Sequence, residues 1–261
     1  MNFQFLLILK ILLFSFLSWF LLGAQSLHSS PTSIKVNESI GSTYLLEKSK
    51  IKKAPVQLKA GSDFVLQKPV ALITKDNSFL EVTLSSDGGH RVMRLGRSTA
   101  IEVRSEKNIF LFQGSFLVSD QNEKELYIQS KSLSTKLRSS GTWLSEVTPI
   151  GIKLIVLEGK VHIQKPNDWH SYSAGKLLLV SDKETNISKP MSIELPLLLR
   201  TSKLLNSFSS TLPTHSRLIS AAKVQSQRTG KKYNALLGDL TANRKLRIWS
   251  EPETQSTSST K

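Results

Sequence analysis

Apolar and polar residues alternate in short runs through the middle of the chain, over residues 60–182. Gly, Asp, Asn and Ser separate these runs at intervals of roughly 8 to 12 residues, which is typical of an all-β domain. Residues 79–84 alternate with period two, an Asp-Gly-Gly sequence follows at 87–89, and alternation resumes over residues 90–95. Because glycine takes positive φ without a steric penalty, this stretch predicts two antiparallel strands joined by a tight turn.

The same alternation recurs to the end of this zone, with no helical period between the runs. We therefore predict a mainly β fold of many short strands, arranged as a sandwich or as a β-roll or solenoid-like stack; periodicity alone does not choose between them. The further predicted strands are residues 99–104, 109–112, 115–119, 125–129, 133–137, 142–147, 152–157, 160–164 and 176–181.

The zone is flanked by segments with different patterns. Residues 27–59 are rich in Ser, Lys and Thr, and we interpret them as a linker with one strand near residues 43–46. Over residues 195–250 the apolar period lengthens to that of short amphipathic helices, and Pro196 is suited to a first helical turn. Residues 251–261 contain nothing to bury and are expected to form a disordered tail.

The predicted helical region has two groups of apolar residues with helical spacing. The first lies between residues 197 and 208, and the second consists of Tyr233, Leu236, Leu237 and Leu240. We expect two or three short helices. We also expect residues 60–182 to fold without the region that begins at residue 195.

The first residues of the chain predict export. Residues 5–24 are almost entirely Phe, Leu and Ile, and Lys10 is their only charge. Small residues at positions 24 and 26 fit cleavage before Leu27, so residues 1–26 are expected to be a signal peptide, with an uncleaved anchor through residues 5–24 as the alternative. No later run approaches membrane length. The rest of the chain is thus expected to be periplasmic or secreted.

Composition changes this picture in two ways. The chain has no cysteine, so disulfides cannot contribute to its stability. Its net charge is +15, and residues 195–250 carry ten basic residues against the single acid Asp239. Because the protein is predicted to be exported, nucleic acid is not expected as a partner. An anionic envelope polymer, a membrane surface or an acidic protein face would match this charge, although a merely solvated basic face is the preferred explanation. The candidate polyanion contacts are Arg228, Lys231, Lys232, Arg244, Lys245 and Arg247.

Six short motifs follow one another in the β zone, and together they resemble the FecR-like domain, named for the ferric-citrate regulator. They are the Asp-Gly turn of residues 79–89, Leu-Gly-Arg-Ser at 95–98, Leu-Phe-Gln-Gly-Ser at 111–115, Gly-Thr-Trp at 141–143, Leu-Glu-Gly-Lys-Val at 157–161 and Ala-Gly-Lys at 174–176. The resemblance covers about residues 77–182. It implies a β domain associated with signal relay and protein contacts across an envelope.

The motif residues are interpreted as structural. The glycines are expected where a strand reverses or approaches a neighbour closely, Glu158-Gly159 is expected to form a turn, and Trp143 is expected in the core. Well-known members of the family carry a cytoplasmic anti-sigma segment ahead of a membrane span. Because the apolar segment here begins at Phe5, we expect a stand-alone exported form without that segment. The motif set is Gly96, Gly114, Gly141, Thr142, Glu158, Gly159 and Gly175.

The sequence offers little catalytic chemistry. His162, His170 and Asp168 flank a predicted turn and are the best candidate for a metal site or a base, although a solvated loop is the preferred explanation. No nucleophile elbow or phosphate-binding loop is present. We therefore expect no enzyme activity, no cofactor and no metal. The expected function is that of an exported binding or scaffolding protein of the bacterial envelope; the alternative is a signal-relay (sensor) subunit that acts with a separate membrane regulator.

Overall fold

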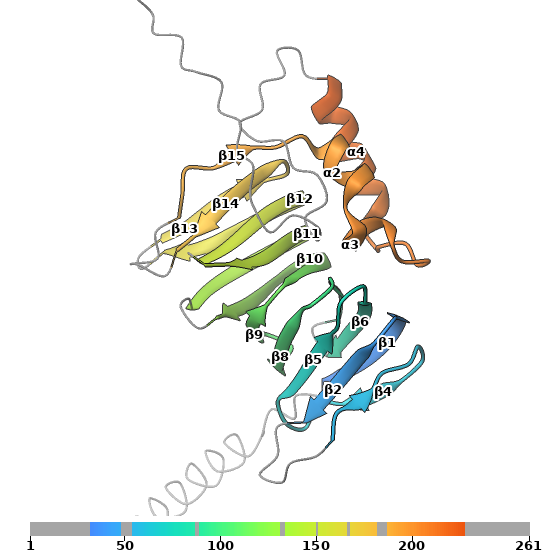
Figure 1. Cartoon of the computed structure of the whole chain (residues 1–261). Helices are drawn as coiled ribbons and strands as arrows, with labels where there is room; N and C mark the ends of the chain where they lie inside the picture. Colours follow the sequence, from blue (N-terminus) through green and yellow to red (C-terminus); the bar gives the residue numbers. More distant parts are fainter. Residues whose placement is uncertain are drawn as a thin grey trace, which may run out of the picture. The chain divides into compact units, whose positions relative to one another are not determined.

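The computed structural model describes residues 32–47, 54–86, 89–130, 134–149, 151–165, 168–181 and 187–227. This part of the chain forms a mixed sheet of 15 strands followed by three short helices (Figure 1). The predicted mainly β fold class is confirmed. The elements are β1 Ser33–Ile40, β2 Thr43–Glu47, β3 Val56–Gln57, β4 Asp63–Val65, β5 Val70–Thr74, β6 Phe79–Ser86, β7 Gly89–Leu95, β8 Ala100–Ser105, β9 Asn108–Gln113, β10 Ser115–Gln129, β11 Ser134–Thr148, β12 Gly151–Lys165, β13 Asp168–Ser173, β14 Lys176–Val180, β15 Met191–Ser192, α2 Leu195–Thr201, α3 Lys203–Asn206 and α4 His215–Gln227.

Strand β10 divides the sheet into two layers. Its first part pairs antiparallel with β7, which continues through β6 and β1 to β4, and we call this branch the first layer. Its last part pairs in parallel with β9, which continues through β8, β5 and β2 to β3, and we call this branch the second layer. Strand β11 pairs with β10 along both parts. A sandwich-like roll results, in which β10, β11 and β12 belong to both layers, β14 and β15 extend the first layer and β13 extends the second.

The long strands correct the predicted strand lengths. Strands β10, β11 and β12 are each 15 residues long, although the sequence predicts two short strands in each of these stretches. The first part of β12 pairs with β14 and its last part with β13. The register shifts between the two parts of these strands. The shift on β10 lies between Asp120 and Lys124, and the shift on β11 lies between Thr142 and Trp143. Each strand therefore bends from one layer into the other without ending.

A pair of glycines makes the bend possible. Gly141 and Gly159 face each other across β11 and β12, and both have positive φ, of 138° and 73°. A Cβ at Gly159 would overlap the carbonyl of Ser140, and one at Gly141 would overlap the carbonyl of Glu158. The prediction of a turn at Glu158-Gly159 is thus wrong, because these residues lie inside β12. The prediction of close backbone approach at the motif glycines is confirmed here.

Other predicted turns are confirmed. Strands β6 and β7 form the expected hairpin, with Leu84 opposite Arg91, and its turn residues 87–88 lie outside the described residues. Gly96 lies between β7 and β8, Gly114 between β9 and β10, and Gly175 between β13 and β14. These three motif glycines therefore lie in short connections between strands, and at Gly175 the chain keeps its direction, because β13 and β14 both pair antiparallel with β12.

The sheet begins earlier than the sequence predicts. Most of the described part of residues 27–59, interpreted as a linker, is strand: β1 pairs with β6 and β4, and β2 pairs with β5 and β3. Ile34 and Val36 are fully buried and the residues beside them are mostly polar. The register shift between Val36 and Glu38 then breaks the alternation. Strand β1 is not predicted from the sequence because it has few apolar positions and because the bulge interrupts its alternation.

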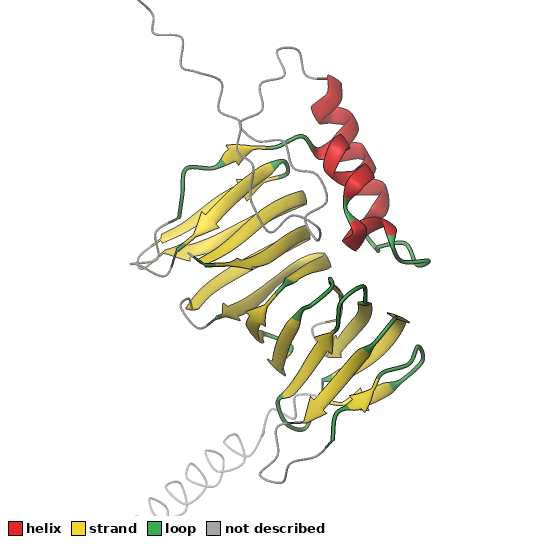
Figure 2. Cartoon of the chain, viewed as in Figure 1, coloured by secondary structure: helices red, strands yellow, loops and turns green. Residues whose placement is uncertain are grey.

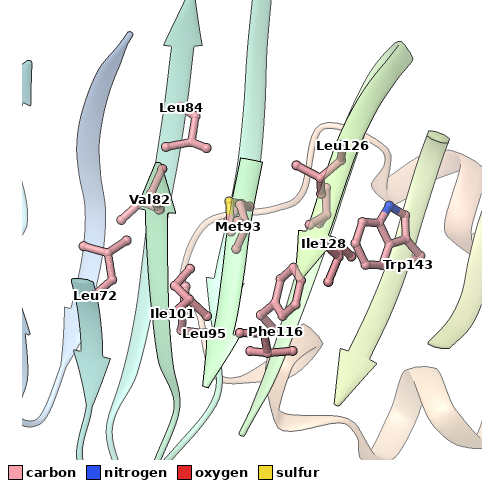
Figure 3. Packing of buried hydrophobic residues seen from close by; sticks show 14 of the residues in the cluster. Leu72, Val82, Leu84, Met93, Leu95, Ile101, Phe116, Leu126, Ile128 and Trp143 are labelled. Carbon is pink, nitrogen blue, oxygen red and sulfur yellow. The ribbon is translucent and has the colours of Figure 1, made fainter. Parts of the chain in front are cut away.

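The main core lies between the two layers. Met93 and Phe116 of the first layer lie in one cluster with Ile101 and Ile128 of the second (Figure 3). Trp143 is fully buried in this cluster and contacts the Phe116 ring edge-on at 5.6 Å, which confirms its predicted place in the core.

The three helices cover the outer side of the first layer (Figure 2). Leu117, Leu144 and Ile155 point away from the main core and pack with Leu198 and Leu204 in a second buried cluster. The helices are thus part of one folded unit, and this packing argues against the prediction that the β zone folds without them, which a truncated chain would test. None of the helices in the described part of the chain is long and apolar enough to cross a membrane. Tyr233 to Leu240, the second predicted helical group, lies outside the described residues.

Candidate binding surface

The outer side of the second layer carries exposed aromatic rings beside basic side chains. On each strand the alternate residues, such as Leu111, Leu126 and Leu137, are buried in the main core, so their neighbours point outward. Phe112 is 42% exposed and Tyr127 40% exposed. We call this surface the aromatic face. Its members are Glu102, Arg104, Phe110, Phe112, Glu125, Tyr127, Gln129, Lys136, Arg138 and Trp169.

One end of the aromatic face is built on β8 and β9. The rings of Phe110 and Phe112 are 4.7 Å apart between centroids, and the Arg104 guanidinium lies 4.9 Å from the centroid of Phe110. Arg104 also donates hydrogen bonds to Glu102, at 2.5 Å, and to the side-chain oxygen of Gln129 on β10, at 2.6 Å. These contacts hold the arginine against the ring, so the side chains are ordered before any partner arrives.

The other end is built on β10, β11 and β13. Arg138 lies 4.5 Å and Lys136 5.9 Å from the centroid of Trp169. Glu125 accepts a hydrogen bond from Arg138 at 2.9 Å and pairs with Lys136 at 3.2 Å. These two partners, Arg138 first, lower the pKa of Glu125 below its ordinary value, so the carboxylate is ionised at neutral pH. Tyr127 lies opposite Lys136, between the two ends.

The composition of the aromatic face is typical of a recognition surface. Tyr, Trp, Phe and Arg are enriched at the centres of protein interfaces, where an aromatic ring buries a large area at a small entropic cost. The face carries three basic and two acidic side chains, so it has a small positive excess.

The motif residues lie elsewhere in the molecule. Thr142 and Glu158 are buried at the bend and hold helix α4: the hydroxyl of Thr142 bonds to that of Thr214, and Arg217 pairs with Glu158 at 3.1 Å. Burial raises the pKa of Glu158, and the charge of Arg217 opposes this shift. The motif thus joins the sheet to the helices. It contributes no residue to the aromatic face.

The histidine candidates do not converge. His162 lies opposite Ser171, and His170 lies opposite Ile163, so the two imidazoles are on opposite faces of the β12–β13 hairpin. Asp168 lies at the start of β13, opposite Lys165. Within the described ranges, no group of three or more His, Asp or Glu side chains could hold a metal ion.

The predicted polyanion contacts cannot be placed. Arg228, Lys231, Lys232, Arg244, Lys245 and Arg247 lie outside the described residues.

A pocket of about 250 Å³ lies where the β6–β7 hairpin meets the bend of β10. Arg91 and Lys124 line it. Arg91 is 3% exposed, pairs with the fully buried Asp120 at 2.8 Å and donates to the carbonyl of Glu106. Its donors are used within the protein, and Lys124 donates to the carbonyl of His90. Both of these basic side chains therefore bond within the protein.

The aromatic face is not predicted from the sequence. Its signal was the presence of Phe110, Phe112, Tyr127 and Trp169 at positions where an alternating strand usually places polar side chains. That signal becomes visible only when the inward and outward positions of each strand are known, because Phe110, Leu111 and Phe112 form one continuous apolar run.

Comparison with known proteins gives a partial similarity in fold. No family model matches the chain, and no curated protein matches it in sequence. A solved structure titled "putative anti-sigma factor", from Parabacteroides distasonis ATCC 8503, is similar with a TM-score of 0.34 and 12% identity. The match covers 46% of this chain and 58% of that one, so the chain spans a little over half of its length.

Proposed function

We propose that this protein is an exported, non-enzymatic binding or scaffolding protein of the bacterial envelope, built on a FecR-like β domain, and that it docks a partner protein on the aromatic face. The observation that carries the proposal is the pair of preordered clusters, Arg104 on Phe110 and Arg138 on Trp169, on either side of the exposed Tyr127. Export is supported by the apolar segment of residues 5–24.

The partner is an envelope protein with an acidic docking face. Rigid aromatic rings lose little entropy when they are covered, and arginine binds carboxylates in a bidentate manner. The chain's net charge of +15 steers an acidic partner toward it. Residues 228–247 add a second, electrostatic contact to anionic lipid or polymer through their basic side chains.

The proposal is tested by co-sedimentation of the protein with an envelope fraction from a bacterial host that exports it. The test variant Phe112→Ala/Tyr127→Ala removes rings that are 42% and 40% exposed. The matched control Ile219→Ala/Val224→Ala removes side chains that are each 51% exposed, on helix α4. We expect the test variant to lose binding by tenfold or more, an estimate that corresponds to about 1.4 kcal/mol, and the control to bind like the wild type.

Two results would contradict the proposal. Equal loss in both variants would show general hydrophobic adhesion, and unchanged binding of the test variant would show that the aromatic face does not dock the partner. If binding survives protease treatment of the envelope fraction, the partner is a polymer and not a protein. If the bound protein is a membrane regulator, this result would support the alternative function of a signal-relay (sensor) subunit.

A further inference from the structure

Strand β13 is an open edge of the second layer. It pairs only with β12, through six residue pairs, and no described residue pairs with its other side. The other edge strands in the described ranges are much shorter: β3 and β15 have two residues each and β4 has three. Short edges offer little to another strand, whereas a six-residue edge presents a row of backbone donors and acceptors.

The hydrogen-bonding direction of each β13 residue follows from its pairing. In an antiparallel pair, successive residues alternately direct both backbone groups toward and away from the partner strand. The N–H of Trp169 donates to the side chain of Asp168 at 2.7 Å, so Trp169 is a residue whose groups point away from β12. Ser171 and Ser173 follow at intervals of two and also point outward.

This edge lacks the usual protection against pairing. Natural edge strands carry lysines, prolines or bulges that prevent another strand from adding. Between residues 168 and 173, β13 has no lysine and no proline, its register with β12 is unbroken, and Asp168 is its one carboxylate. Ser171 and Ser173 are exposed.

We propose that β13 pairs with β13 of a second copy of this chain, antiparallel about a two-fold axis at Ser171. This register places Ser171 opposite itself and Trp169 opposite Ser173, so all three outward-pointing residues face outward-pointing residues, and the Trp169 N–H exchanges its bond to Asp168 for one to the second strand. A shift of two residues either way leaves one of them without a partner. Small serines face the Trp169 ring and each other, and His170 lies opposite Tyr172, so no like charges are directly opposed.

A two-fold axis perpendicular to the sheet joins the second layers of the two copies into one sheet. The two aromatic faces then lie on the same side of that sheet, and the dimer docks two copies of a partner or a repetitive one. This consequence rests on the proposed docking function, whereas the strand pairing does not.

The absence of cysteine from the chain gives a sharp test. In a dimer of Ser171→Cys, the introduced thiol can react only with the thiol at position 171 of the second chain. We expect the full-length chain, exported by a bacterial host, to run as a disulfide-linked dimer on a non-reducing gel. The matched control is Ser173→Cys, on the same face of the same strand. Its thiols are separated by four residues, or about 14 Å, and cannot form the bond.

The reversible interface is tested on the isolated exported protein by sedimentation. We expect wild type and Ser171→Ala to be dimers, and Ser171→Asp to be a monomer because two carboxylates would face each other across the axis. Ser171→Asp changes an exposed side chain, so its melting temperature checks that the fold is kept. A wild-type monomer at all concentrations, or a dimer that survives Ser171→Asp without disulfide formation in Ser171→Cys, would overturn the proposal. Loss of partner binding in Phe112→Ala/Tyr127→Ala does not bear on it.

Discussion

The two outer faces of this roll differ in what covers them and in what they are made of. The first-layer face has aliphatic side chains, including Leu117, Leu144 and Ile155, and helices α2 to α4 pack on it. The aromatic face has exposed rings with arginines against them, and no described element covers it. Strands β10 and β11 contribute to both faces. The helices bury the first face within the fold, and the exposed rings of the other face are the basis of the proposed docking function.

The ion pairs of the two faces differ in the same way. Glu81 and Arg94 are 3% and 1% exposed, and their side chains meet at 2.7 Å beneath the helical segment. Arg94 also donates to the carbonyls of Leu204 and Ser210, which ties the helices to the sheet. Burial lowers the pKa of Arg94, and its contact with Glu81 opposes the shift. On the aromatic face Arg138 and Glu125 are 42% and 35% exposed.

Removal of the helices is expected to have the largest effect. A chain that ends before Leu195 would expose the aliphatic face of the first layer and leave Glu81 and Arg94 without the contacts of the helical segment. We expect it to aggregate or to lose cooperative thermal unfolding. A chain that ends after Gln227 is the control and should unfold like the full-length protein. A soluble shorter chain with a sharp melting transition would show that the helices are dispensable.

Breaking the buried ion pair should cost about 3–5 kcal/mol of unfolding free energy, because Glu81→Ala leaves the Arg94 charge buried without its partner. The comparison is Glu125→Ala on the aromatic face, where an exposed pair contributes about 1 kcal/mol or less. Urea unfolding of both variants measures the difference. Similar losses of unfolding free energy in the two variants would mean that the ion pairs of the two faces do not differ in strength.

Truncation of one side chain on each face should separate them further. Leu144→Ala removes a side chain that is 2% exposed and should destabilise the protein by about 2–5 kcal/mol. Tyr127→Ala removes a side chain that is 40% exposed and should change stability by about 0.5 kcal/mol or less. If Tyr127→Ala proved as destabilising as Leu144→Ala, the aromatic face would be part of the core and not a docking surface.

The pH dependence of two carboxylates should have opposite signs, and this is the smallest effect. The pKa of Glu158 is raised in the folded state, so wild type loses stability relative to Glu158→Gln as pH rises through and above the ordinary value of 4.5. The pKa of Glu125 is lowered, so wild type gains stability relative to Glu125→Gln over the pH range up to that ordinary value. Thermal melts of the three proteins between pH 3 and pH 7 measure both slopes, and slopes of equal sign would contradict the account.

How far the sequence predicts this fold depends on what each pattern records. Alternation records inward and outward positions, so the β6–β7 hairpin was predicted with its strands in place. A glycine indicates that the backbone can adopt unusual dihedral angles, but not whether a turn or a bend results. Gly141 and Gly159 are therefore predicted as ends of strands, whereas in the structure they allow long strands to bend. The spacing of apolar residues in the helices predicts that one face of each helix is buried, but it does not predict which part of the sheet that face packs against.

The aromatic face could not be predicted from the sequence for a related reason. Phe112, Tyr127 and Trp169 come from three strands and share one face only through the pairing of β9, β10, β11, β12 and β13. Register of this kind is set by long-range contacts that no local pattern contains. Glu81 and Arg94 illustrate the same limit, because their burial depends on a segment more than a hundred residues later in the chain.

The most direct test of the difference between the two faces is site-specific photo-cross-linking in a bacterial host that exports the protein. A photoreactive phenylalanine analogue is placed at Phe112 on the aromatic face or at Ile219 on the outer side of helix α4, which are 42% and 51% exposed. The account predicts one discrete protein adduct from position 112, lost when Tyr127→Ala is added, and none from position 219. An adduct from position 219 alone, or the same adducts from both positions, would contradict it.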